Sequence, residues 1–529
     1  MGEPLVLTFD VGTQSVKALL IDKNGHIAAQ TQRYYETPYY SLQPNWAEQD
    51  PELYFQELCE ASVELKKVAP EAFEAAECVA VTVFRDSFVC LDKEGKPLRD
   101  CILWMDQRKV KNPKPVPAVR QALFAAVGMW ESAEMLNRTC MCNWIVENEP
   151  EIWEQTEKFV LLSTYLNLRM TGRLVDSWAS QIGHIPFDYK NRCWDENGLT
   201  RCLYDIPTEK LCDIVPAGSQ IGGITAECAL RSGMREGLVL VATGSDKGCE
   251  TLGLGAIQPD QAALSFGTSC TVHLTSKKYF EPMPYVPAFP AVPNDLYNGE
   301  VQLWRGYWML TWFKDNFAQK EAEEAAMLGC SVYDLLNARL KEVPPGCDGL
   351  MVLPHWTPGL ATPGARGAMV GFSDVHTRHH IYRAIIEGLN FGLMEGMYGM
   401  EKRAHQRVRR LYVAGGGSRS DEICQITANM FGLPVHRIQT SEACALGAAM
   451  CAFVSRGEFR NYREAIASMV HVWDTFRPDM AEHEIYKELY GQVYGHLYKK
   501  LVPLHKRLAA LTRGIRRKET RDVQTVETL

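Results

Sequence analysis

The 529-residue chain lacks three features that would assign it to a class at once. It contains no run of about 18 apolar residues, so the sequence predicts no membrane-spanning helix. It has no excess of basic residues, because its net charge at pH 7 is −8. That charge argues against a nucleic-acid or anionic-membrane partner, although it leaves room for a local basic site for phosphates. The N-terminus has neither a basic start nor a leader-like apolar run, so we expect a cytoplasmic protein.

The 17 cysteines also lack the arrangement of a metal site. The sequence has no Cys-x-x-Cys pair, and Cys140 and Cys142 do not have the spacing of zinc ligands. We interpret the cysteines as reduced thiols that serve as small core or surface residues in a cytosol.

The length of the chain bounds the number of its domains. The chain is too long for one core, so we expect two or more domains.

Two short glycine–threonine turns lie in different halves of the chain. Each follows an apolar run that is typical of a strand, over residues 5–9 and 262–266, and each precedes another β-prone run. Each turn is therefore predicted to be the tip of a β-hairpin. Glycine lets a ligand approach the backbone there and hydroxyls add donors, so such a tip is a good anion site. The candidate phosphate-binding residues are Gly12, Thr13, Ser15 and Lys17 in the first turn and Gly267 and Thr268 in the second.

Strands and helices alternate along the chain, which favours an α/β protein. Residues 5–33 are predicted to form a three-stranded meander, and residues 51–67 have helical spacing. A strand over 410–414, a glycine loop over 415–417, a helix over 421–431 and a strand over 435–438 form a unit that is a standard place for a nucleotide. Ser420 is the expected N-cap of that helix.

Helical spacing over residues 379–403 is interrupted by glycines at every fourth position. Gly388, Gly392 and Gly396 each cost a helix up to about 1 kcal/mol relative to alanine. We expect them to form a smooth ridge that a neighbouring helix or strand approaches closely. The alternative is an irregular loop.

Two aspartates are candidates for chemistry. Asp246 follows the apolar strand at 238–243, and carboxylates at the carboxyl ends of strands face ligand crevices in α/β proteins. It could be the base that a kinase needs near the attacking hydroxyl, or the N-cap of a following helix. Asp10 could hold Mg²⁺ or its water shell, or it could close the hairpin as an Asx-turn residue. Lys17 could neutralise phosphate, or it could be a solvated strand lysine.

A second cluster follows two other strands. Arg85 and Asp86 come after one, and Trp104, Asp106 and Arg108 come after another. Asp and Arg together can bind vicinal hydroxyls, and an indole can pack on the carbon chain of a sugar. Taken separately, these residues also fit surface ion pairs and a core aromatic side chain.

Together these elements resemble the FGGY family of carbohydrate kinases. The matching residues extend over about residues 5–455 and comprise Asp10-x-Gly12-Thr13-x-Ser15-x-Lys17, Trp104-x-Asp106-x-Arg108, Gly244-Ser245-Asp246, Phe266-Gly267-Thr268, Ala365-Arg366-Gly367-Ala368 with Gly371, and Gly415-Gly416-Gly417-Ser418-Arg419-Ser420. Each motif is loose by itself, but the set in this order is specific.

The resemblance implies an α/β fold of two actin-like (ribonuclease H-like) domains with an interdomain ATP cleft. We expect the domains over residues 1–257 and 258–505, followed by a polar C-terminal tail over 506–529 that frays near its end. The resemblance also implies ATP and Mg²⁺ as cofactors. The roles that it assigns are catalytic base for Asp246, metal site for Asp10 and Asp246, phosphate binding for Thr13, Gly267 and Thr268, adenosine binding for Gly416, Gly417 and Ser420, and sugar binding for Arg85, Asp86, Trp104 and Asp106.

The substrate pattern is mixed. Arg85-Asp86 is closer to the Arg-Glu pattern of glycerol-type kinases, whereas Trp104-x-Asp106-x-Arg108 is closer to the xylulose type, and the segment 305–308 is bulkier than usual for the family. We therefore predict phosphorylation of a small sugar, a pentulose such as xylulose or ribulose, with glycerol or another polyol as the alternative. A silent sugar- or nucleotide-binding regulator and an actin- or chaperone-type ATPase are alternatives of other classes. The expected partner is the small substrate, with no nucleic acid and no membrane, and the chain is a candidate homodimer.

Overall fold

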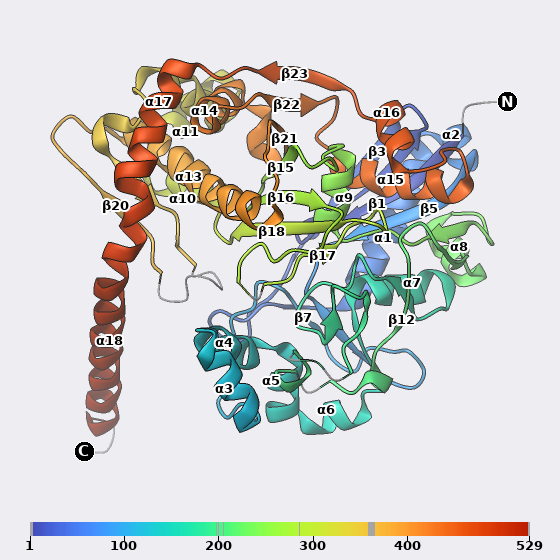
Figure 1. Cartoon of the computed structure of the whole chain (residues 1–529). Coiled ribbons are helices and arrows are strands. Elements are labelled where there is room, and N and C mark those ends of the chain that lie inside the picture. The colour runs from blue at the N-terminus through green and yellow to red at the C-terminus, as the bar shows by residue number, and fades with distance from the viewer. Residues whose placement is uncertain are drawn as a thin grey trace. The chain divides into compact units, whose positions relative to one another are not determined.

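The computed structural model describes residues 4–526 except for 197, 199, 205, 285 and 358–364. Its chain divides into two compact units (Figure 1). The first comprises Met1–Gln261, Leu274–Gly299 and Ile438–Trp473, and the second comprises Ala262–His273, Glu300–Arg437 and Asp474–Leu529. Within the described residues, no helix is both long and apolar enough to cross a membrane.

A six-stranded sheet with the order β13-β14-β5-β1-β2-β3 forms the centre of the first unit. Strands β1 (Leu5–Val11), β2 (Ser15–Asp22) and β3 (Ile27–Tyr34) are antiparallel neighbours, which confirms the predicted meander. Strand β5 (Ala76–Val83) runs parallel to β1, and β14 (Val239–Val241) runs parallel to β5. At the edge, β13 (Gln220–Gly223) is antiparallel to β14.

The first unit also contains helices and smaller sheets. The helices are α1 (Pro51–Val68), α2 (Pro70–Glu74), α3 (Ala118–Ala126), α4 (Trp130–Thr139), α5 (Met141–Asn148), α6 (Pro150–Gln155), α7 (Leu162–Thr171), α8 (Ala226–Ser232), α9 (Asp246–Gly253), α15 (Ala443–Arg456) and α16 (Tyr462–Met469). A four-stranded sheet has the order β4 (Glu48–Gln49), β7 (Cys101–Ile102), β6 (Phe88–Leu91) and β8 (Lys158–Leu161). Two-stranded sheets pair β10 (Phe187–Asp188) with β11 (Cys193–Trp194), and β12 (Asp213–Val215) with β9 (Val175–Ser177).

Helix α1 shows how the sequence builds this unit. Asp50 caps it by accepting the backbone N–H of Glu52 at 2.9 Å, and Pro51 occupies its first turn, where a missing N–H costs nothing. One face of the helix, including Tyr54, Phe55 and Leu58, is buried in the hydrophobic core that also contains the inward side chains of β1 and β2. Burial of this stripe stabilises the helix more than its propensity does.

A seven-stranded sheet has the order β17-β18-β16-β15-β21-β22-β23. Its strands are β15 (Gln261–Phe266), β16 (Cys270–Ser276), β17 (Phe289–Pro290), β18 (Tyr297–Leu303), β21 (Arg410–Ala414), β22 (Val435–Ile438) and β23 (Val472–Phe476). Strands β19 (Met351–Leu353) and β20 (Ala368–Val370) form a separate pair. The helices of the second unit are α10 (Trp308–Phe317), α11 (Gln319–Leu328), α12 (Val332–Ala338), α13 (Arg378–Ala404), α14 (Asp421–Phe431), α17 (Met480–Leu489) and α18 (Gly495–Val526). Mixed sheets and helices in both units confirm the predicted α/β class.

The glycines of α13 are where the sequence predicts a close approach. A Cβ atom on Gly388 would lie 2.4 Å from the backbone oxygen of Val352 in β19. On Gly392 it would lie 2.9 Å from Leu303 of β18, and on Gly396 2.7 Å from Val301 of the same strand. The expectation of a helix with a smooth ridge, rather than a loop, is therefore confirmed.

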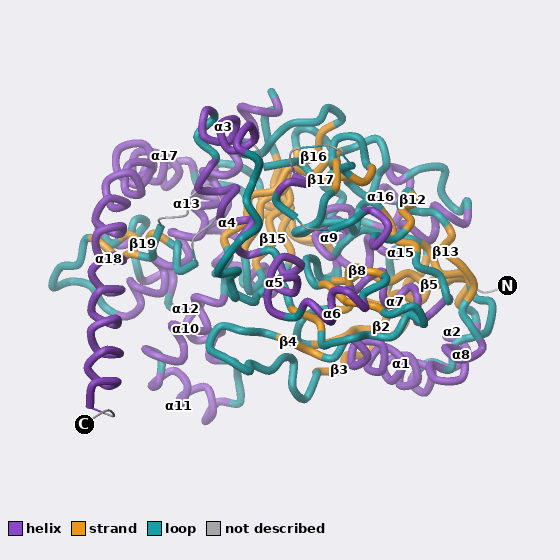
Figure 2. Tube along the Cα trace, turned by 90° about the horizontal axis from the view of Figure 1, so that it is seen from below, coloured by secondary structure: helices purple, strands orange, loops and turns teal. Residues whose placement is uncertain are grey.

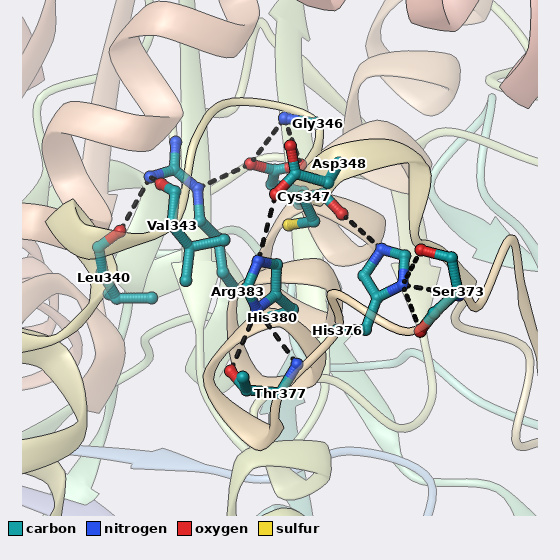
Figure 3. Close-up of polar contacts among 11 residues, drawn as sticks. Leu340, Val343, Gly346, Cys347, Asp348, Ser373, His376, Thr377, His380 and Arg383 are labelled. Carbon is teal, nitrogen blue, oxygen red and sulfur yellow. Dashed lines mark hydrogen bonds and ion pairs between the residues drawn. The ribbon is translucent and has the colours of Figure 1, made fainter.

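Polar side chains fix the beginning of α13 (Figure 3). The backbone N–H of Thr377 donates to Nδ1 of His380 at 3.2 Å, and Nε2 of His380 lies 3.2 Å from a carboxylate oxygen of Asp348. One turn further, Arg383 donates to the carbonyl of Leu340 at 2.8 Å. The first contact pairs a backbone N–H at the start of the helix, and the other two connect the helix with residues 340–348.

The end of the chain differs from the expectation of a frayed polar tail. Helix α18 is continuous to Val526 (Figure 2), so the expectation of a frayed end is wrong for residues 513–526, and residues 527–529 lie outside the described part. The physical reason lies in the sequence, because the stretch 506–526 is rich in Leu, Ala, Lys and Arg, which are strong helix formers. The boundary of the polar tail at 506 stays a prediction.

Candidate active site

Asp246 is the first residue of α9, directly after the loop that leaves β14. The hydroxyl of Ser245 caps the helix by accepting the N–H of Gly248 at 3.4 Å, so the alternative in which Asp246 is the N-cap is wrong. A carboxylate oxygen of Asp246 accepts the backbone N–H of Lys247 at 2.8 Å and lies 3.8 Å from Nε of Arg85. Burial raises the pKa of Asp246, whereas the charges of Lys247 and Arg85 lower it. The net increase makes its carboxylate a stronger base than a solvated one.

Asp10 lies within β1, opposite Lys17 of β2. The hairpin is closed beyond it, where the N–H of Gly12 donates to the carbonyl of Ser15 at 2.9 Å, so Asp10 is not the turn residue that the alternative requires. Burial raises the pKa of Asp10 to about 7, and the charge of Lys17 opposes this effect. The negative charges of Asp246, Glu442 and Glu250 raise the pKa further. Asp10 is therefore held among carboxylates that the neighbouring cations do not fully neutralise.

Two ion pairs border these aspartates. Nζ of Lys17 lies 2.5 Å from a carboxylate oxygen of Glu442, which precedes α15, and Nζ of Lys247 lies 2.7 Å from Glu250. Each lysine thus acts on an aspartate and a glutamate at once, so its charge does not fully balance either carboxylate. The first pair was not predicted, because nothing local in the sequence connects Lys17 with Glu442.

The oxygen donors of Asp10 and Asp246 fit a hard divalent cation such as Mg²⁺. Among the described residues, no group of three or more His, Cys, Asp or Glu side chains is arranged to hold a metal. Mg²⁺ in phosphoryl-transfer sites usually binds one or two protein carboxylates and takes its other ligands from phosphate and water. The raised pKa of Asp10 also supports a cation at this position, because a nearby cation would remove the electrostatic cost of ionising Asp10.

The first glycine–threonine turn is connected to the predicted sugar cluster. The indole Nε1 of Trp104 donates to the hydroxyl of Thr13 at 3.0 Å, and the Trp104 backbone N–H donates to the hydroxyl of Ser87 at 3.0 Å. The hydroxyl of Ser15 accepts a hydrogen bond from Gln32 at 3.0 Å. Trp104 therefore positions a residue of the turn, in addition to the sugar contact that we predict for it.

Asp86 and His184 form a pair beside Arg85. A carboxylate oxygen of Asp86 lies 2.8 Å from Nδ1 of His184, and the Asp86 side chain is 17% exposed. Burial raises the pKa of Asp86, but the contacts with His184 and the charge of Arg85 outweigh this effect, so the pKa lies below its ordinary value. Asp86 is therefore ionised at neutral pH. His184 was not among the predicted site residues, because it lies on a loop far from Asp86 in the sequence.

Asp106 is held differently. Its buried carboxylate accepts hydrogen bonds from Arg108 at 2.9 and 2.8 Å and from the backbone N–H of Ala47 at 2.7 Å. The Arg108 guanidinium lies over the rings of Trp46 and Trp144, 3.9 and 4.5 Å from their centroids. These contacts support a positioning role for Asp106, and its contact with a sugar stays a prediction.

In the second unit, one tyrosine joins the second turn to the glycine loop. The N–H of Tyr307 donates to the carbonyl of Gly267 at 2.9 Å, and its ring stacks on Phe266 with a centroid separation of 5.1 Å. A Cβ atom on Gly417 would lie 2.3 Å from the Tyr307 ring, and one on Gly415 would lie 2.8 Å from the Phe266 backbone. The bulky segment 305–308 thus packs between the two motifs. Thr268, at the turn, is exposed, and its carbonyl accepts the N–H of Gly306 at 2.8 Å.

The remaining residues of the glycine loop have different environments. Gly416 is exposed and has no atom within 4 Å of an added Cβ. Ser420 is the N-cap of α14, as predicted, because its hydroxyl accepts the N–H of Ile423 at 3.3 Å. Strands β21 and β22 are parallel, as the strand–loop–helix–strand prediction requires.

The structure thus brings Asp10, Lys17, Asp246, Arg85 and Asp86 together in the first unit. Gly267, Thr268, Gly416, Gly417 and Ser420 belong to the second unit. Binding of one triphosphate by both turns therefore stays a prediction, as do the domain boundaries at 257 and 505.

Nearly the whole chain is similar in sequence to known proteins. The model of the N-terminal domain of the FGGY family of carbohydrate kinases matches residues 5–253, and the model of the C-terminal domain matches residues 262–456. The uncharacterized sugar kinase YgcE of Escherichia coli (strain K12) is 28% identical over 479 residues, which cover 90% of each chain. A xylulose kinase of Bacillus subtilis (strain 168) is 26% identical over 491 residues, 92% of this chain and 95% of the relative.

A solved structure has a similar fold. The ligand-bound xylulose kinase from Lactobacillus acidophilus superimposes with a TM-score of 0.81 over 96% of this chain and 100% of its own, at 21% sequence identity. At that identity the likeness shows the fold, and the predicted two-domain actin-like fold is confirmed.

Proposed function

Because the chain belongs to the FGGY family of carbohydrate kinases, we propose that it transfers the γ-phosphoryl group of ATP to a hydroxyl of a pentulose such as xylulose or ribulose. The observation that carries the proposal is the placement of Asp246. Its carboxylate lies at the beginning of α9, has a raised pKa, and lies 3.8 Å from Arg85, beside the predicted sugar cluster.

Asp246 is the proposed general base. It accepts the proton of the substrate hydroxyl as the oxygen attacks the γ-phosphorus, a role for which a carboxylate with a raised pKa is suited. Arg85 restrains the carboxylate and binds the acceptor, together with Asp86. Trp104 packs against the carbon chain and holds Thr13 through its indole N–H.

The proposed nucleotide site uses the residues of the two turns. Thr13 and Ser15 of one turn, and Gly267 and Thr268 of the other, donate backbone and hydroxyl hydrogen atoms to phosphate oxygens. Gly12, whose N–H is bound to the carbonyl of Ser15, lets a phosphate approach the backbone closely. Gly416, Gly417 and Ser420 lie against the adenosine. Asp10 and Asp246 would hold Mg²⁺, which when bound neutralises charge on the phosphate oxygens. Lys17 acts on the site through its ion pair with Glu442, which keeps the positive charge close to Asp10.

The pentulose is favoured by the xylulose kinase of Bacillus subtilis, which is similar over nearly the whole chain. Arg85-Asp86 supports a second candidate, glycerol or another polyol, because this pair is closer to the glycerol-type pattern. One methylene changes discrimination by roughly 1–3 kcal/mol, so the residue types of the pocket do not by themselves separate the two.

ADP release from ATP, with and without ketopentoses, polyols and glycerol, tests the proposal. Release that depends on one ketopentose, with a sugar phosphate formed in equal amount, supports it, and release that depends on glycerol supports the second candidate. Release without any acceptor would make the protein an ATPase. Binding without release would make it a regulator, and either result contradicts the proposed function.

A further inference from the structure

We propose that His184 is a positively charged positioning residue that holds the carboxylate of Asp86 in the orientation used for sugar binding. The inference rests on the proposed function, because it concerns how the sugar cluster of that kinase is built. It adds a residue that no sequence motif indicated and gives it a defined protonation state.

Asp86 is held from one side by His184. The backbone N–H of His184 donates to Oδ1 of Asp86 at 2.8 Å, and Nδ1 of its ring lies 2.8 Å from Oδ2. Asp86 itself has a φ of 55°, in the left-handed region that non-glycine residues rarely adopt. At Gly183 an added Cβ would lie 2.4 Å from Oδ1 of Asp86, so only glycine permits this approach. The geometry therefore depends on both residues of the 183–184 segment.

The contacts of the ring support one protonation state. The hydroxyl of Thr139 donates its one hydrogen to the carbonyl of Met135 at 2.9 Å within α4. The contact between this hydroxyl and Nε2 of His184, 3.4 Å long, therefore fits a ring that carries hydrogen on Nε2. Nδ1 faces the ionised carboxylate of Asp86 and must also be a donor. With hydrogen on both nitrogens, the ring is an imidazolium.

Two other histidines show the contrast (Figure 3). Nδ1 of His376 accepts the backbone N–H of Ser373 at 2.8 Å, and Nδ1 of His380 accepts the N–H of Thr377 at 3.2 Å. A nitrogen that accepts a hydrogen bond carries no hydrogen, so in both rings only Nε2 is left to donate. His184 has a carboxylate where they have a backbone donor.

The other groups around His184 leave Asp86 as its charge partner. Arg85 precedes Asp86 and adds a positive charge, while the thiol of Cys140 lies 3.9 Å from the His184 carbonyl. The hydroxyl of Tyr189 lies 3.3 Å from the N–H of Gly183, and the ring of Tyr204 lies 6.2 Å from that of His184. Burial raises the pKa of both tyrosines, so they are neutral, and the charged pair is Asp86 with His184.

The pair has a consequence for the kinase. The imidazolium balances Asp86, so the sugar cluster gains a fixed hydrogen-bond acceptor without adding net negative charge near Asp246. Loss of the His184 ring would leave Oδ1 of Asp86 bound to the backbone N–H but Oδ2 without its ring contact, and the sugar would have to order that oxygen on binding. The effect should fall on the affinity for sugar, because His184 does not touch the reacting atoms.

Two variants separate the hydrogen bond from the charge. His184→Asn keeps an N–H donor where Nδ1 lies but removes the charge, whereas His184→Leu removes both. Because hydrogen bonds to charged groups are among the stronger ones, we expect the KM for sugar to rise by about tenfold in His184→Asn and about a hundredfold in His184→Leu, with kcat changed by less than about threefold. The exposed His496→Leu variant is the matched control and should keep wild-type constants.

Proton NMR titration of the histidine rings provides a readout that needs no sugar. Asp86 raises the pKa of His184 although burial lowers it, so its ring should titrate above the ordinary value of 6.5 and shift downward in Asp86→Asn. A His184 ring that titrates at or below 6.5, or a His184→Leu enzyme with the wild-type KM, would overturn the inference.

The two experiments also distinguish this inference from the proposed function. If no sugar or polyol is phosphorylated while His184 titrates as expected, the proposed function fails, the role in sugar binding fails with it, and the charge pairing stands. If an acceptor is found and His184→Leu binds it normally, the positioning role fails alone.

Discussion

Replacing Asp10 with asparagine should stabilise the protein at neutral pH. Burial and the charges of Asp246, Glu442 and Glu250 raise the pKa of Asp10 from 3.8 to about 7, even though Lys17 opposes them. The folded protein therefore incurs a cost when Asp10 ionises, and asparagine has a similar shape without that charge. A residue kept at a stability cost within a site is typical of function.

The magnitude follows from the size of the pKa difference. A change from 3.8 to about 7 is about three pH units, and at 1.36 kcal/mol per unit it sets an upper limit of about 4 kcal/mol. Asp10 is half-buried, so screening by water reduces this to about 2 kcal/mol. Between the two pKa values the folded state binds more protons than the unfolded state. Wild-type stability should therefore fall as pH rises from about 4 to about 7, whereas an asparagine side chain at this position does not titrate.

Thermal unfolding of both proteins at several pH values between about 5 and about 8 tests this expectation. The Asp10→Asn variant should unfold at a higher temperature at pH 8, and the difference should shrink toward pH 5. Asp213→Asn, at an exposed position of the same unit, is the control and should show no such trend. A difference that is equal at every pH, or a lower unfolding temperature for Asp10→Asn at pH 8, would refute the electrostatic reasoning.

Two glycine substitutions test packing near the site. Gly417→Ala should weaken ATP binding and lower the unfolding temperature, because its Cβ would lie 2.3 Å from Tyr307. Gly416→Ala is the control and should keep the wild-type unfolding temperature, because open space surrounds Gly416. Equal unfolding temperatures for the two variants would contradict the Tyr307 contact. Gly447→Ala should move α15 against α9 and lower both stability and kcat, since its Cβ would lie 2.0 Å from the Cys249 carbonyl. Gly399→Ala in α13 is the control for Gly447→Ala and should raise the free energy of unfolding by up to about 1 kcal/mol. For both pairs of variants, unfolding curves measure the stability and turnover measures kcat.

The parts of the molecule that sequence could predict are those in which local residues dominate. The meander over 5–33 follows from apolar runs separated by turn residues, and Ser420 was recognisable as a helix cap from its position before an acidic first turn. The glycines of α13 indicated a close approach but not its partner. Local propensity also explains the error at the C-terminus, where charge suggested a tail although the residue types favour a helix.

The parts that sequence could not predict depend on contacts between distant segments. Glu442 reaches Lys17 across 425 positions, and His184 reaches Asp86 across 98, and neither carries a local signal. Tyr307 was noticed as bulky, but its place between Phe266 and Gly417 required the fold. When a single residue from a distant element completes a site, the spacing of the motifs does not predict it.

Phosphoryl transfer by Asp246→Asn, measured in a single turnover with the sugar and ATP bound, tests the central claim most directly. If Asp246 is the base, both ligands should bind with nearly wild-type affinity while the rate of transfer falls by about 10²-fold or more. Transfer at a near-wild-type rate in this variant would contradict the account.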